Sequence, residues 1–181
     1  MTKKDVLQSI SAEEAASVLH QLVATSSAIR KKAEEIALTL LVDVDAEEVA
    51  EDVYLELDSL RVEDVWDNSG AKRDGYVDTG DCAWEMFAEA LQPFLQEMQK
   101  CQDLSLNVQA KWHCMGILEG IHRFETESES EYKDWAVDAP GEYFVRIYDI
   151  WKKEVKNKKE VAEIRKFIKD LAPGREKYCK G

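Results

Sequence analysis

Glu119 and His122 have the spacing of a pair of metal ligands, because they stand three positions apart in a segment with helical periodicity. A Glu-x-x-His pair places a carboxylate and an imidazole on one side of a helix, as in bundle proteins that bind two iron ions. Such a site needs further glutamates opposite, and Glu85 and Glu89 stand four apart on the preceding predicted helix. The sequence holds no second Glu-x-x-His. We therefore expect a solvated acidic face, with a metal site as the alternative.

A second set of carboxylates lies nearer the N-terminus. Helical nucleotide pyrophosphohydrolases bind Mg²⁺ through Glu-x-x-Glu on one helix and Glu-x-x-Asp on the next. Glu48 and Glu51 match one half of that pattern, but neither Glu34 nor Glu35 has an acid three residues further on. The sequence also contains no glycine-rich phosphate loop and no nucleophile in a recognisable catalytic setting. We expect no cofactor and no catalysis, and a metal-dependent hydrolase or oxidase on a helical core is the alternative.

Two glycines and a tryptophan mark a candidate interaction surface. Gly116 and Gly120 lie four apart on a predicted helix, one turn after Trp112. Glycine costs about 1 kcal/mol inside a helix, so some gain must offset it. Close approach of a neighbouring helix is the favoured explanation, and a small-molecule groove lined by Trp112 is the alternative.

These residues are positioned by a predicted helical hairpin in the middle of the chain. A glycine-punctuated loop from residue 70 precedes two amphipathic segments, 82–101 and 106–124, separated by a short polar turn. Apolar residues recur at spacings of three and four on each, which predicts one buried stripe per helix. We expect Trp84 and Phe87 to anchor this core. Two long stripes joined by a short turn favour an antiparallel pair.

Further helices are predicted on both sides of the hairpin. Ser11 and Glu14 have the spacing of a capping box at the start of a first helix. Outside the hairpin, one helix is predicted over about 12–24 and a short one over about 62–68. Four more are predicted around the apolar stripes 29–41, 49–60, 144–155 and 161–171. No convincing strand is predicted, because Tyr76 and Val77 form too short a run. The sequence thus predicts an all-α fold of seven or eight helices, arranged as an irregular stack of antiparallel hairpins resembling HEAT or tetratricopeptide arrays.

The length of 181 residues fits one domain with a single core. We divide this expected domain, 1–181, into N-terminal helices 1–69, the central hairpin 70–125 and C-terminal helices 126–181. Residues 125–131 alternate glutamate with serine or threonine. We expect them to form a mobile loop too polar to bury, and a kinase target is the alternative.

Charge is distributed unevenly along the chain. The net charge is −13, which argues against nucleic-acid binding because phosphates require a basic face. Residues 152–181 hold 11 Lys or Arg and 5 Asp or Glu, so this tail is basic and the rest is acidic. The tail also has an apolar helical stripe formed by Val161, Ile164, Ile168 and Leu171. We expect it to dock on its own body, with an acidic or apolar partner as the alternative.

Cellular location is predicted from hydropathy and cysteine content. No run of about 18 apolar residues occurs, and the first ten residues lack a hydrophobic signal core. The four cysteines form no Cys-x-x-Cys pair and three lie in helical patterns, which favours buried reduced thiols. We therefore expect a cytoplasmic protein without membrane contact.

The region from about residue 45 to 155 resembles a group of prokaryotic all-helical proteins associated with SWIM-type zinc-finger proteins. The resemblance is carried by Gly75-Tyr76-Val77, Ala83-Trp84-Glu85 and Asp138-Ala139-Pro140-Gly141, which have the character of a turn, a core anchor and a bend. The Cys-x-Cys and Cys-x-His ligands of a SWIM finger are absent from this sequence. The resemblance therefore implies a helical fold and no zinc site.

Together these patterns favour a non-catalytic helical scaffold. The missing catalytic arrangements and the predicted hairpins indicate a domain that binds another protein, or a second copy of itself. We expect the contact to use a groove or an exposed aromatic patch.

Overall fold

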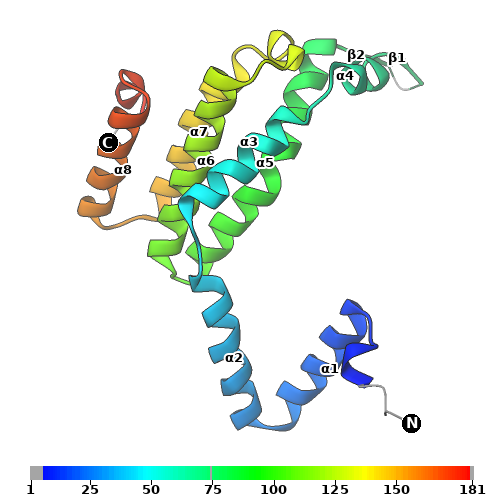
Figure 1. Cartoon of the computed structure of the whole chain (residues 1–181), viewed down its shortest axis with the longest axis vertical. Coiled ribbons are helices and arrows are strands. Elements are labelled where there is room, and N and C mark those ends of the chain that lie inside the picture. The colour runs from blue at the N-terminus through cyan, green and yellow to red at the C-terminus, as the bar shows by residue number, and fades with distance from the viewer. Residues whose placement is uncertain (1–5, 74, 180–181) are drawn as a thin grey trace. The chain divides into compact units, whose positions relative to one another are not determined.

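A computed structural model describes residues 6–73 and 75–179 (Figure 1). The chain divides into two compact units, Met1–Asp43 and Val44–Gly181, which we call the N-terminal unit and the C-terminal unit. Our expectation of one domain over 1–181 stays a prediction. Neither α-helix of the N-terminal unit contributes a buried residue.

The N-terminal unit is a pair of helices in contact with each other. A short 3₁₀ helix, η1 (Val6–Gln8), precedes α1 (Ala12–Thr25) and α2 (Ser27–Val42). The predicted capping box is confirmed: the Glu14 amide donates to Ser11 Oγ at 3.2 Å, and the Ser11 amide donates to Glu14 Oε2 at 2.8 Å. Local sequence thus sets the start of α1, whereas no tertiary core forms around it within this unit.

The C-terminal unit is a helical bundle centred on α6. Its elements are α3 (Ala46–Asp58), α4 (Val62–Asn68), β1 (Gly70–Lys72), β2 (Gly75–Val77), α5 (Thr79–Asp103), α6 (Asn107–Glu127), η2 (Glu131–Asp134), α7 (Ala139–Glu154), α8 (Lys158–Leu171) and η3 (Arg175–Lys177). Helices α3, α5, α7 and α8 all pack against α6. The all-α prediction is confirmed, with eight α-helices in the part of the chain that the structure describes. The packing is centred on α6, and the resemblance to HEAT or tetratricopeptide arrays stays a prediction.

Two short strands form where we predicted none. β1 and β2 pair antiparallel, with Ala71 opposite Tyr76. Gly70 and Gly75 have φ values of 83° and 141°, which glycine adopts at little cost and other residues rarely do. Each strand has three residues, which is too short a run to be recognised from sequence. Separately, no described helix is long and apolar enough to cross a membrane.

Aromatic side chains fill the middle of the C-terminal unit. The ring of Phe87 lies 5.9 Å from that of Phe124 and 5.5 Å from that of Tyr143, centroid to centroid. Phe87 is fully buried, as predicted for a core anchor. Trp84 is only partly buried and packs against Tyr143 at 5.9 Å. Phe87 is thus the stronger anchor of the predicted pair.

The basic tail docks on its own body, as predicted. Ile164 and Ile168 of α8 are fully buried, and α8 packs against α6. Lys111 Nζ of α6 lies 2.8 Å from Glu163 Oε2 on α8.

The predicted thiol state is also confirmed, because all four cysteines are free and buried.

Candidate interaction surface

The two glycines of the predicted surface are covered by a helix. A Cβ atom at Gly116 would lie 2.6 Å from the Val49 Cβ atom, and one at Gly120 would lie 2.6 Å from the Val53 Cβ atom. Both glycines are buried, so α3 crosses α6 where α6 lacks side chains. The favoured explanation, close helix approach, is therefore the one observed. Of this predicted surface only Trp112, 37% exposed, reaches solvent.

The predicted metal-ligand candidates do not assemble into a site. Glu85 and Glu89 are exposed on α5, and Glu119 and His122 are half-buried on α6. Over residues 6–73 and 75–179, no three His, Cys, Asp or Glu side chains converge in a way that would hold a metal ion. Burial raises the pKa of Glu119, assisted by the nearby Glu47. The environment of the Glu119 carboxyl is therefore that of a partly buried residue between packed helices, and not that of a metal ligand.

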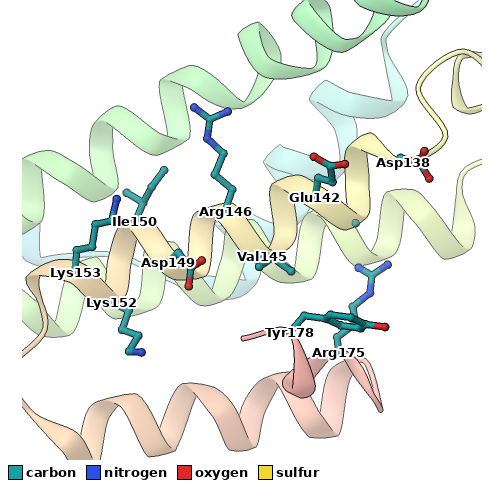
Figure 2. A pocket seen from close by; sticks show the side chains of 11 residues that line it. Asp138, Glu142, Val145, Arg146, Asp149, Ile150, Lys152, Lys153, Arg175 and Tyr178 are labelled. Carbon is teal, nitrogen blue, oxygen red and sulfur yellow. The ribbon is translucent and has the colours of Figure 1, made fainter. Parts of the chain in front are cut away.

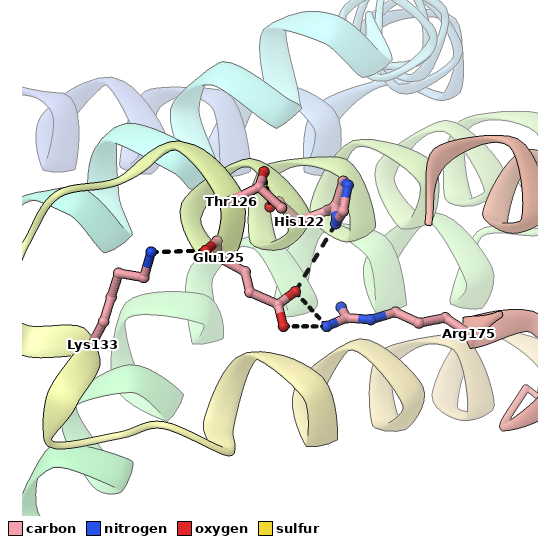
Figure 3. Close-up of polar contacts among 5 residues, drawn as sticks. All are labelled: His122, Glu125, Thr126, Lys133 and Arg175. Carbon is pink, nitrogen blue, oxygen red and sulfur yellow. Dashed lines mark hydrogen bonds and ion pairs between the residues drawn. The ribbon is translucent and has the colours of Figure 1, made fainter. Parts of the chain in front are cut away.

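His122 belongs to a polar cluster that fixes the end of α6 (Figure 3). Its Nδ1 atom lies 4.0 Å from Glu125 Oε2, and Glu125 forms an ion pair with Arg175 from η3. Lys133 Nζ donates to the Glu125 and Ser128 carbonyl oxygens at 2.7 and 2.9 Å, which satisfies free acceptors at the helix end. Burial lowers the pKa of His122 and Arg175 lowers it further, against the opposite effect of Glu125. The cluster ties the tail to the bundle.

The glutamate and serine segment 125–131 is more ordered than we predicted. Helix α6 continues to Glu127, and Ser128 is buried. Ser128 Oγ donates to Asp58 Oδ1 at 2.6 Å, and Ser130 Oγ donates to the Leu60 carbonyl at 3.4 Å. These bonds satisfy the serine hydroxyls, which removes the cost of burying them. The segment is therefore held against the α3–α4 junction.

Two exposed tryptophans meet beside this junction. Trp66 of α4 and Trp135, directly after η2, have ring centroids 6.2 Å apart and an interplanar angle of 84°. Trp66 is 56% exposed and Trp135 is 39% exposed. Each sits on an anchored element, because α4 buries Val62 and Val65 and η2 buries Tyr132, whose hydroxyl donates to the Ala83 carbonyl. The rings are held in place while their faces remain open to solvent.

An acidic hollow of about 440 Å³ is lined by residues of the elements that carry the tryptophans. It is lined by residues of the α3–α4 junction and of segment 129–131, namely Asp58, Leu60, Arg61, Val62, Glu63, Glu129, Ser130 and Glu131. Four of these side chains are exposed carboxylates and one is a guanidinium, whose Nε atom lies 3.7 Å from Glu63 Oε2. An exposed ion pair of this kind contributes little to stability. The four carboxylates outnumber the single guanidinium, so the hollow is acidic.

The tryptophans and the hollow are carried by the same elements, because Val62 and Glu63 of the hollow lie in α4 with Trp66. Trp66 lies one helical turn beyond Val62, and Trp135 follows η2, which begins at Glu131. We call this the Trp–acid surface and define it by Trp66, Trp135, Asp58, Glu63, Glu129 and Glu131. The sequence does not predict this surface, because Trp66 follows Val62 by four residues, a spacing that predicts burial on the same face.

A larger open groove of about 1180 Å³ runs along α7 (Figure 2). Its charged lining has both signs, with Asp138, Glu142 and Asp149 among Arg146, Lys152, Lys153 and Arg175. Arg175 and Tyr178 come from the segment after α8, whereas Arg146 points to the other side of α7. These charges do not converge on one point. The charges of the α7 groove therefore indicate no particular class of ligand, whereas the Trp–acid surface combines exposed aromatic rings with carboxylates.

Comparison of the chain with models of known protein families, with curated proteins and with solved structures finds no match. The resemblance to the SWIM-associated group consequently stays a prediction.

Proposed function

We propose that this chain is a non-catalytic interaction domain that binds a basic segment of a partner protein through the Trp–acid surface. The observation that carries the proposal is the exposed, mutually packed pair Trp66 and Trp135 beside four carboxylates. Tryptophan is enriched among the residues that dominate binding energy. Lysine and arginine also stack favourably on indole faces, and the carboxylates attract the same cations.

The charge of the chain supports a basic partner. Residues 1–43 hold five Lys or Arg and six Asp or Glu, so residues 44–181 hold the remaining 19 and 31, a net charge of −12. Such a field speeds the approach of a cationic segment and falls with salt. Specificity must then come from the tryptophans, because net charge alone attracts any basic peptide.

Fluorescence anisotropy with labelled synthetic peptides tests the proposal. A peptide with alternating lysine, arginine and leucine residues is compared with one in which glutamate replaces every basic residue. We expect the first alone to bind, and Trp66→Ala or Trp135→Ala to weaken binding about tenfold or more, the loss of a central aromatic anchor. These variants keep the net charge, so bulk electrostatics cannot explain a loss.

Trp112→Ala is the matched control, because Trp112 is a partly exposed tryptophan outside the Trp–acid surface. It should bind the basic peptide as the wild type does. Equal affinity of the wild type and both surface variants would refute a role for the tryptophans. Equal binding of the acidic and basic peptides would refute the assignment of a basic partner.

A further inference from the structure

The N-terminal unit presents apolar stripes that its own fold leaves uncovered. In α2, Ile29, Ile36 and Leu40 fall on one side of the helix, with Leu40 74% exposed. In α1, Val18 and Leu22 stand four residues apart and are also exposed. Neither helix contributes a buried residue. Helices of this length gain most of their stability from burying an apolar face, so a partner that covers these stripes would stabilise the pair.

The spacing of these residues indicates the kind of partner. Ile29, Ala33, Ile36 and Leu40 are separated by four, three and four residues, which is the heptad seam of helices that pack nearly parallel or antiparallel. Two helix pairs of this type form a four-helix bundle around one apolar core. A second copy of the unit supplies the same stripes, and a two-fold axis places each surface against itself.

Charge favours a contact between copies at this unit. Residues 1–43 carry a net charge of only −1, against −12 for residues 44–181. Two copies of this acidic protein repel one another least where their nearly neutral units meet. We propose that the N-terminal unit is a self-association module in which two chains join their helix pairs into a four-helix bundle. This inference is independent of the Trp–acid surface, which lies in the other unit.

Multi-angle light scattering and sedimentation of the full chain over a range of concentrations test the proposal. We expect a mass of twice the 20.7 kDa of one chain at high concentration. Leu40→Glu should raise the dissociation constant about tenfold or more, because the dimer would bury an unpaired charge. Leu40→Ala should shift it in the same direction while keeping high helix propensity, which guards against loss of α2 itself.

Leu38→Glu is the matched control. Leu38 is the same residue type, is also exposed at 47%, and lies about 200° around α2 from Leu40. It should dimerise as the wild type does. A wild type that stays monomeric throughout overturns the proposal and points to another occupant of the stripes, such as a different protein or the rest of the chain. A dimer unaffected by Leu40→Glu, or disrupted equally by Leu38→Glu, also overturns it.

Discussion

At the scale of single residues, the bundle depends on two missing side chains. Gly116 and Gly120 let the backbone of α3 approach α6 so closely that Cβ atoms would meet the Ala46 and Ala50 carbonyl oxygens at 2.6 and 2.7 Å. Those neighbours are backbone atoms, which cannot move aside as a flexible side chain can. The close approach offsets the helix propensity that glycine lacks.

The first prediction concerns Gly116→Ala. The new methyl group overlaps α3, so the variant should lose about 1–3 kcal/mol of unfolding free energy, measured by urea denaturation. Gly141→Ala is the control, because Gly141 is also helical but has no atom within 4 Å of an added Cβ. It should be neutral or slightly stabilising. Equal effects of the two substitutions would contradict the close packing of α3 on α6.

At the scale of elements, α8 shows how a polar helix is held by a narrow stripe. Its buried residues are Ile164 and Ile168, and most of its other side chains are exposed and charged. Asn157 caps the helix, because its side-chain oxygen accepts from the Lys159 amide at 3.0 Å. The Lys111–Glu163 pair adds little by itself since Glu163 is exposed. The docking therefore rests on the two isoleucines together with partly buried apolar neighbours on the same helix, namely Val161, Phe167 and Leu171.

The second prediction follows for Ile168→Ala. Removing a fully buried isoleucine side chain should cost about 2–5 kcal/mol and lower the thermal midpoint. Lys166→Ala, at an exposed position of the same helix, should leave the midpoint nearly unchanged. Thermal unfolding followed by circular dichroism distinguishes the two. A small effect of Ile168→Ala would mean that α8 is not docked in solution.

At the scale of the whole molecule, the two units differ in packing and in charge. The C-terminal unit has one continuous apolar core contributed by α3 to α8, whereas the N-terminal helices bury nothing within their own unit. Local stability follows buried apolar contacts, so the units should open with very different free energies. A partner of the N-terminal unit would reduce that difference.

The third prediction is a contrast in amide hydrogen exchange. In dilute protein, amides of α1 and α2 should exchange about tenfold or more faster than those of α5 and α6, because their helices open without breaking a core. Mass spectrometry of peptides from each helix gives the rates. Protection of α1 and α2 that rises with protein concentration would agree with self-association. Equal protection at high dilution would show that the N-terminal unit has support within the single chain.

The sequence by itself determined most of the local structure. The capping box of Ser11 and Glu14 predicted the start of α1, because its hydrogen bonds involve atoms only three residues apart. Apolar spacing predicted the hairpin of α5 and α6 and the inward stripe of α8, since periodicity records which side of a helix is buried. The all-α class follows from these local signals together.

Only the tertiary structure decided which surfaces meet. Trp66 contacts Trp135, which lies 69 residues further along the chain. The packing of α3 over Gly116 likewise joins segments that are far apart in the sequence. Periodicity marks a face as apolar without naming its partner, because any apolar surface of suitable shape can cover it. The stripe of α2 has the same pattern as the stripes of the core helices, yet within its unit it stays exposed.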